Sequence, residues 1–70
     1  MITLEQAETF VRRAAEFDDG QDPEVLRYEV RIDRGVVSVV AYNWSVQLQR
    51  RIWKSRAIPK AEVIAGSQLR

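Results

Sequence analysis

The chain has 70 residues, enough for one small domain and too few for a second hydrophobic core. It contains neither cysteine nor histidine, which excludes disulfides, thiolate chemistry, the common zinc sites and any Ser-His-Asp arrangement. The net charge of +1 hides a split, because residues 1–26 carry seven acids against two arginines and residues 27–70 carry nine bases against three acids. This asymmetry indicates a charged partner.

A domain this small buries only roughly 60 % of the surface that its unfolded chain exposes, so a partner or a second copy of the chain is expected to help stabilise it. The hydrophobic fraction of 46 % is typical of a folded domain. The N-terminal residues lack the apolar core of a signal peptide, and the longest apolar stretch, residues 36–42, is too short to span a membrane. We therefore expect a soluble cytoplasmic protein that has no membrane partner and that forms a homodimer or binds another molecule.

The first predicted element is an amphipathic helix from Thr3 to Phe17. Its apolar residues recur at three- and four-residue steps. Thr3 and Gln6 match the capping box, which satisfies amide donors at a helix start. Gly20 suits the left-handed residue that ends a helix, and a polar loop with Pro23 follows.

Two strands are predicted next. Residues 26–33 alternate strictly between apolar and charged side chains, which indicates a strand with one buried and one solvated face. Arg34-Gly35 fits a two-residue turn, and residues 36–44 form the return strand. This turn predicts a register with the pairs Ile32–Val37, Val30–Val39, Tyr28–Ala41, Arg27–Tyr42 and Val25–Trp44.

The second face of the return strand is too apolar for a face in water. Val36, Val40, Tyr42 and Trp44 lie on it, so either the C-terminal segment or another molecule is expected to cover it. Arg27 beside Tyr42 would add a cation–π contact at such a surface.

Residues 46–53 fit neither a helical stripe nor strict alternation, and a third strand is favoured there over a helix. Residues 59–69 are expected to form a short helix with proline in its first turn. Together these elements predict a single α+β domain over residues 1–70, with the N-terminal helix packed on a small antiparallel sheet of two to three strands. The expected core comprises Leu4, Ala7, Phe10, Val11, Ala14, Phe17, Leu26, Tyr28, Val30, Ile32, Val37, Val39 and Ala41.

Residues with catalytic chemistry are scarce. The acidic cluster of residues 18–24 lies in a loop, where a tiny domain has little material for a water-excluding cleft, and it lacks the ligand order of a calcium-binding loop. The sequence has no glycine-rich phosphate-binding loop. We expect no enzymatic activity, no cofactor and no metal.

The basic segment 50–60 is the strongest candidate for a binding site. Arginine and lysine neutralise phosphates, and a tryptophan offers a surface on which a base can stack. The alternative is a solvated face whose tryptophan packs on the core. The expected order of helix, three strands and helix resembles that of double-stranded-RNA-binding domains, from which Pro59 and the Arg34-Gly35 turn depart. The resemblance implies phosphate contacts near the start of the second helix by Lys54, Arg56 and Lys60.

Three hypotheses for function follow. The first is a protein-binding adaptor or stoichiometric inhibitor, similar in size to those of phages and mobile elements, with the binding residues Arg27, Tyr42, Trp44, Arg50, Arg51, Trp53, Lys54, Arg56 and Lys60. The second is nucleic-acid binding by the residues of that set in segment 50–60. The third is imitation of nucleic acid toward a basic protein by Glu5, Glu8, Glu16, Asp18, Asp19 and Asp22.

Overall fold

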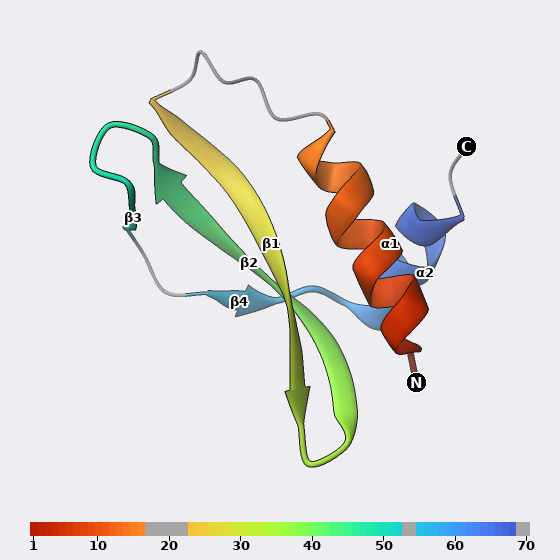
Figure 1. The fold of residues 1–70 in the computed structure, drawn as a ribbon. Helices are drawn as coiled ribbons and strands as arrows, with labels where there is room; N and C mark the ends of the chain where they lie inside the picture. Colours follow the sequence, from red (N-terminus) through yellow and green to blue (C-terminus); the bar gives the residue numbers. More distant parts are fainter. Residues whose placement is uncertain (17–22, 53–54, 69–70) are drawn as a thin grey trace.

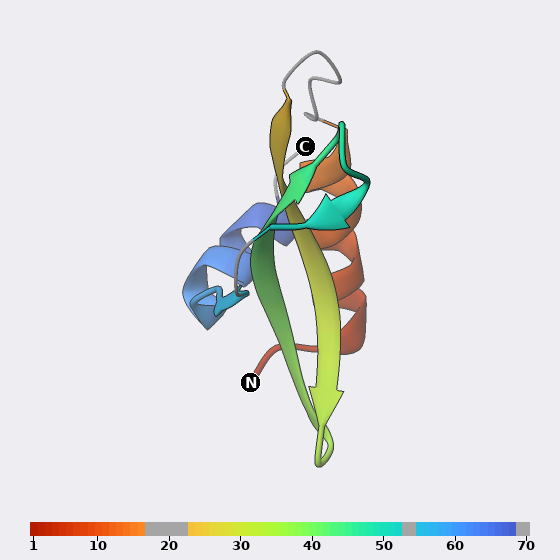
Figure 2. The same cartoon turned by 90° about the vertical axis from the view of Figure 1, so that its left-hand side faces the viewer.

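The computed structural model describes residues 1–16, 23–52 and 55–68. Its elements follow the order α1 (Leu4–Ala15), β1 (Glu24–Asp33), β2 (Val36–Ser45), β3 (Arg50–Arg51), β4 (Arg56–Ala57) and α2 (Lys60–Ser67). Both helices lie on one side of the antiparallel sheet (Figures 1 and 2). The predicted α+β architecture is therefore confirmed, with two short strands, β3 and β4, beside the long hairpin.

Helix α1 begins where the capping box predicts. The Thr3 hydroxyl accepts a hydrogen bond from the Gln6 amide at 3.1 Å, and the Gln6 side chain accepts one from the Thr3 amide at 3.0 Å. These bonds satisfy two of the donors that a helix start leaves without partners. The helix ends at Ala15, and the predicted continuation to Phe17 and the cap at Gly20 lie outside the described residues.

The β1–β2 register agrees with every predicted pair, from Ile32–Val37 to Val25–Trp44. Arg34 and Gly35 at the turn have φ angles of 52° and 77°. Positive φ at both positions gives the two-residue turn whose twist matches that of the flanking strands. The hairpin therefore forms as the alternation of β1 requires, and both strands extend slightly further than predicted.

The segment after β2 differs from the prediction. Residues 46–49 form a turn, and in the described part of the expected third strand Arg50–Arg51 pairs with β2 and the Ile52 amide donates a hydrogen bond to the Asn43 carbonyl at 3.1 Å. Gln49 has a φ of 56°, a left-handed conformation that reverses the chain direction. The fourth strand, Arg56–Ala57, was not predicted, because two residues are too few to show an alternating pattern.

The core lies between the helices and the hairpin. Its buried residues are Ile2, Ala7, Val39 and Val63, and the partly buried Phe10, Val11, Tyr28, Val30, Val37, Ile58 and Ile64 pack against them. Ile2 and Val63 were missed by the sequence pattern. They come from the segment before α1 and from the short helix α2.

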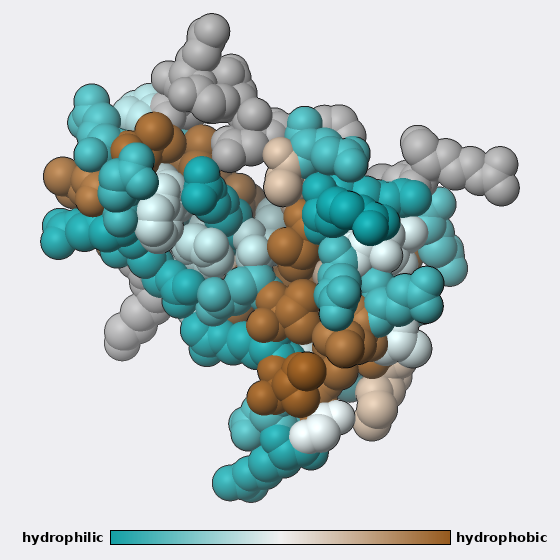
Figure 3. Space-filling model, in the orientation of Figure 1, coloured by the Kyte–Doolittle hydropathy of each residue, from teal (hydrophilic) through white to brown (hydrophobic). Residues whose placement is uncertain are grey.

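Three predicted core residues are instead exposed, namely Leu4 (43 %), Leu26 (45 %) and Ile32 (60 %). A ten-residue strand spans about 33 Å and a twelve-residue helix only about 18 Å. The helix layer therefore leaves the ends of β1, where Leu26 and Ile32 lie, without full cover. Figure 3 shows apolar side chains gathered in the strip where β1 and α1 adjoin.

Gly66 lies inside α2 and permits a close approach of the two helices. A Cβ atom at this position would lie 2.5 and 2.7 Å from two ring carbons of Phe10. Phe10 also packs edge-to-face against Tyr28, with ring centroids 5.1 Å apart. One phenylalanine thus joins α1 to both α2 and β1, and glycine is the residue that leaves room for it.

Candidate binding face of the sheet

The side of the sheet opposite the helices is formed by alternate residues of the hairpin and by one residue of β3. Figure 2 views the molecule from this side, with the helices behind the hairpin. We call this surface the open face; it comprises Arg27, Glu29, Arg31, Asp33, Val36, Ser38, Val40, Tyr42, Trp44 and Arg51. Helix α2 does not cover this face, since it packs beside α1 on the other side, but the C-terminal segment does reach it, because Ser55 accepts a hydrogen bond from Arg31 and Val40 on this face is buried.

Two arginine–aromatic stacks occupy the open face. The guanidinium carbon of Arg51 lies 4.1 Å from the Tyr42 ring centroid, and that of Arg27 lies 5.2 Å from the Trp44 ring. Both distances are within the roughly 6 Å range of cation–π attraction. The predicted contact of Arg27 with Tyr42 is therefore replaced by one with Trp44.

The strand register explains this exchange. Arg27 is the cross-strand partner of Tyr42, and Arg51 is the partner of Trp44. Each arginine reaches diagonally to the neighbouring ring of β2, a separation that long side chains can bridge. The three strands β1, β2 and β3 are thereby joined across the open face by side chains as well as by backbone hydrogen bonds.

Glu29 connects Arg51 with Arg31, and these three residues together with Ser55 form what we call the Glu29 network. The Glu29 carboxylate accepts a hydrogen bond from Arg51 at 2.9 Å and one from Arg31 at 3.1 Å. Partial burial raises the pKa of Glu29. The hydrogen bonds and charges of Arg31 and Arg51 lower this pKa by more than burial raises it, so the pKa lies below its ordinary value. Arg31 also donates to the Ser55 hydroxyl at 3.3 Å. The carboxylate is therefore ionised near neutral pH and orders two arginines.

The described basic residues of segment 50–60 do not form one surface. Arg50 and Arg51 are successive residues of a strand, so their side chains leave opposite faces and only Arg51 joins the open face. Arg56 pairs with Ala41, a residue of the helix-facing set of β2. Lys60 is the first residue of α2. The structure thus brings together Arg27, Tyr42, Trp44 and Arg51 and separates the other described basic candidates from them.

The acidic candidates are only partly described. Glu5 and Glu8 are exposed on α1, and Glu16 is its C-cap. Glu5 in the first turn and Arg12 and Arg13 in the last turn suit the helix dipole, whereas Glu16 at the C-cap has the unfavourable sign. The candidates outside the described residues are Asp18, Asp19, Asp22, Trp53 and Lys54.

Three residues of the network were missed by sequence reasoning. Glu29 and Arg31 lie on the face of β1 that the alternation assigns to solvent. Their position beside Arg27 on that face was the sequence signal that could have identified them as part of the site. Ser55 had no such signal, because it lies before a two-residue strand. The ion pairs of Glu29 depend on where the turn after β2 returns the chain.

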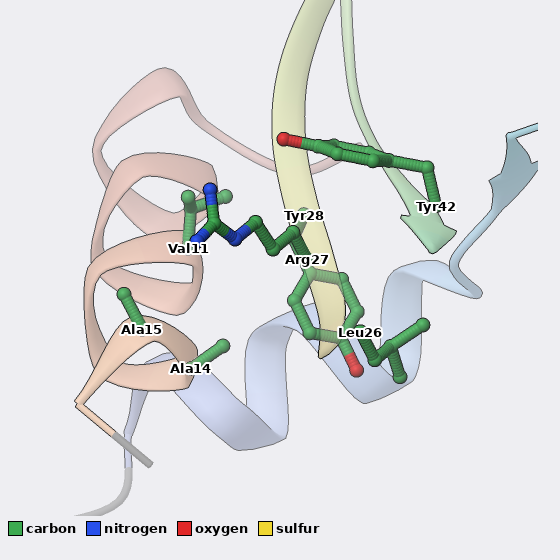
Figure 4. Close-up of a pocket in the computed structure, with 7 residues that line it drawn as sticks. All are labelled: Val11, Ala14, Ala15, Leu26, Arg27, Tyr28 and Tyr42. Atoms are coloured by element: carbon green, nitrogen blue, oxygen red, sulfur yellow. The ribbon is translucent and has the colours of Figure 1, made fainter. Parts of the chain in front are cut away.

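An open pocket of about 240 Å³ lies where α1 meets β1 (Figure 4). It is lined by Val11, Ala14, Ala15, Leu26, Arg27, Tyr28 and Tyr42. This volume is below the roughly 300–1,000 Å³ of small-molecule sites, and the described residues that line the pocket include no carboxylate. The pocket suits one or two apolar side chains better than a cofactor.

Within residues 1–16, 23–52 and 55–68, no group of three histidine, cysteine or acidic residues is placed to hold a metal ion. None of the helices described is long and apolar enough to cross a membrane.

No protein-family model, curated protein or solved structure matches the chain. Its function therefore has to be inferred from the geometry of the open face and of the neighbouring strand edge.

Proposed function

We propose that the chain is a non-enzymatic binding protein that docks its open face onto a protein partner, as a small adaptor or stoichiometric inhibitor does. The observation that carries this proposal is the pair of arginine–aromatic stacks on that face. The few residues that dominate binding at protein interfaces are enriched in tryptophan, tyrosine and arginine. Tyr42, which also lines the pocket beside α1, and Trp44 are both half-buried, so part of each ring remains accessible to a partner.

The contacts of Glu29 support this proposal, because they order side chains before a partner arrives. Immobilising a long side chain on binding costs about 0.5–1.5 kcal/mol. Arg51 is held both by the Glu29 carboxylate and by the Tyr42 ring, so part of that cost has already been met on folding. A rigid face of this kind favours a specific partner surface over adaptable, non-specific contact.

The charge distribution favours a protein over a nucleic acid. Phosphate binding needs several cations along one track that are not already neutralised. Arg31 and Arg51 share the single carboxylate of Glu29 at 3.0 and 2.9 Å, which neutralises part of their charge, while the side chain of Arg50 lies on the opposite side of the strand. A partner that presents apolar groups with a few carboxylates around them would match the open face better than a regular row of phosphates.

The proposal is tested by capture of partners from a native lysate on immobilised chain. We expect proteins retained by the parent chain to be lost with Trp44→Ala and with Arg51→Glu. The matched control is Leu48→Ala, since Leu48 is 59 % exposed in the turn after β2 and lies outside the open face. If Trp44→Ala and Arg51→Glu retain every protein that the parent retains, the open face is not the docking surface. Circular dichroism of each variant checks that it is folded.

A further inference from the structure

Strand β1 is at the edge of the sheet and pairs with β2 along one side only. The Val39 carbonyl on β2 accepts a hydrogen bond from the Ile58 amide at 2.9 Å, so its backbone groups point away from β1. Val30, the cross-strand partner of Val39, must then direct its own N–H and C=O groups to the outer edge. The described residues form no backbone hydrogen bond, outside the hairpin ladder, to the outward-pointing set Leu26, Tyr28, Val30 and Ile32.

The charges along β1 alternate in sign, in the order Arg27, Glu29, Arg31 and Asp33. An antiparallel pair of two β1 strands centred on Val30 places Glu29 opposite Arg31 of the second copy and Arg27 opposite Asp33 of the second copy. All four charge pairs across the twofold axis then join opposite signs, and opposite charges stabilise cross-strand pairs. Pairing centred on Glu29 or on Arg31 would instead bring identical charges together.

We propose that the chain forms a twofold homodimer in which two β1 strands pair antiparallel about Val30 and join the two sheets into one. Val30 lies on the axis with its backbone donor and acceptor directed outward, as a hydrogen-bonded central pair requires. An exposed edge strand is a template for such pairing unless the protein blocks it. Pairing centred on Val30 joins four pairs of opposite charges, whereas pairing centred on Tyr28 or on Ile32 joins only two, so the alternation of charge in β1 favours the Val30 register.

The pocket between α1 and β1 supports the same register. Ile32 is 60 % exposed, and in this pairing it falls opposite Tyr28 of the second copy. Tyr28 lines the pocket together with Leu26 and with Val11 and Ala14 of α1 (Figure 4). The Ile32 side chain of each copy therefore enters the apolar pocket of the other. The same contact removes Leu26, which is 45 % exposed, from water.

The dimer does not depend on the proposed function, because its backbone hydrogen bonds use the outer edge of β1, although the charged side chains that set its register, Arg27, Glu29, Arg31 and Asp33, belong to the open face. It would also supply the burial that a 70-residue chain without disulfides needs. The open faces of the two copies become one continuous surface. Trp44→Ala and Arg51→Glu are expected to remain dimeric, so failure of the partner-capture experiment and failure of the dimer are distinguishable.

Sedimentation velocity across a wide range of protein concentration tests the dimer. We expect the parent chain to change from monomer to dimer as its concentration rises, and Ile32→Lys to remain monomeric. Leu48→Lys is the matched control, since Leu48 is equally exposed, at 59 %, but lies in the turn after β2, and this variant should dimerise like the parent. A parent chain that is monomeric throughout, or an Ile32→Lys variant that dimerises normally, overturns the proposal.

Two further measurements test the register. Arg31→Glu and Glu29→Arg each bring like charges together in their own dimer, whereas a mixture of the two variants brings opposite charges together. We expect each variant alone to sediment as a monomer and the mixture to form a heterodimer; a mixture that stays monomeric contradicts pairing about Val30.

In the parent chain, amide exchange at Tyr28, Val30 and Ile32 should slow as the dimer forms. Fast exchange at these amides in the dimer means that another surface pairs.

Discussion

The guanidinium group of Arg51 lies over the ring of Tyr42, 4.1 Å from its centroid, although Arg51 pairs through its backbone with Trp44. The contact therefore crosses the sheet diagonally. Strand β3 has only two residues, so its backbone hydrogen bonds alone provide little stability. The stack on Tyr42 and the ion pair with Glu29 explain why the chain returns to β2 at this point.

The coupling between Tyr42 and Arg51 is measurable. Tyr42→Leu keeps apolar bulk but removes the aromatic face, and we expect it to lower the free energy of unfolding by about 0.5–1 kcal/mol, as for a partly exposed cation–π pair. Arg51→Met and the double variant complete a mutant cycle, followed by urea denaturation. Tyr42→Phe, which keeps the ring, is the control. Strictly additive losses would mean that the two side chains do not interact.

Stability should depend on pH through Glu29. Its folded-state pKa lies below the ordinary value, so the ionised carboxylate stabilises the fold above the ordinary glutamate range, and this contribution is lost as pH falls through the folded-state pKa. We therefore expect Glu29→Gln to be less stable than the parent at neutral pH and the difference to shrink in acid. Urea denaturation between neutral pH and about pH 3, at one low protein concentration, measures this.

Glu8→Gln is the control for that series, because Glu8 lies on the exposed side of α1 and outside the network. An equal loss at all pH values in the Glu29 variant would contradict the assigned ion pairs with Arg31 and Arg51.

Gly66→Ala is expected to destabilise the protein despite the better helix propensity of alanine. The propensity gain in a helix interior is about 1 kcal/mol. The added Cβ would lie 2.5 Å from a Phe10 ring carbon, and overpacking of this kind costs about 1–3 kcal/mol. Chemical denaturation should show a net loss in Gly66→Ala and partial recovery when Phe10→Leu is added. A more stable Gly66→Ala variant would contradict the close packing of α1 against α2.

Arg34 carries a conformational cost that substitution can remove. Its φ of 52° is left-handed, which costs an ordinary side chain roughly 1 kcal/mol, and asparagine before glycine is the favoured sequence for this turn. We expect Arg34→Asn to raise the midpoint of thermal unfolding. Arg34→Val, a β-branched residue in the same place, should lower that midpoint. The opposite order of the two variants would contradict the turn geometry.

Binding to double-stranded DNA and RNA separates the two leading hypotheses. The described basic residues of segment 50–60 that lie outside the Glu29 network, Arg50, Arg56 and Lys60, are on different elements, so we expect no submicromolar binding at physiological salt. Fluorescence anisotropy with labelled duplexes at low and physiological salt measures this. Submicromolar affinity that falls steeply with salt would show that these residues act together on phosphates, and nucleic-acid binding would then replace the protein-docking proposal.

The hairpin and the start of α1 were predictable because local interactions specify them. The alternation in β1 allows only one register, since a slip of one residue would move Tyr28 and Val30 from the core to the opposite face. The turn at Arg34-Gly35 sets the same register independently. The cap at Thr3 involves residues only three positions apart, so its hydrogen bonds can be predicted from the sequence pattern.

Other parts of the structure depend on residues that are distant along the chain. The placement of β3 follows from the left-handed Gln49, and no nearby pattern indicates that reversal. The limited length of α1 leaves Leu26 and Ile32 exposed, although their alternation is that of core residues.

The amino-acid sequence by itself determined the fold class, the hairpin register and the segregation of charge, because these depend on composition, period and turn chemistry. Only the tertiary structure decided that Arg51 lies over Tyr42, that Arg27 lies over Trp44 and that Glu29 holds two arginines. The same basic and aromatic residues are compatible with several surfaces until the turn after β2 brings β3 against the sheet. The physical reason is that a side-chain contact between strands requires both strands to be in place, and their relative position is set by packing across the whole domain.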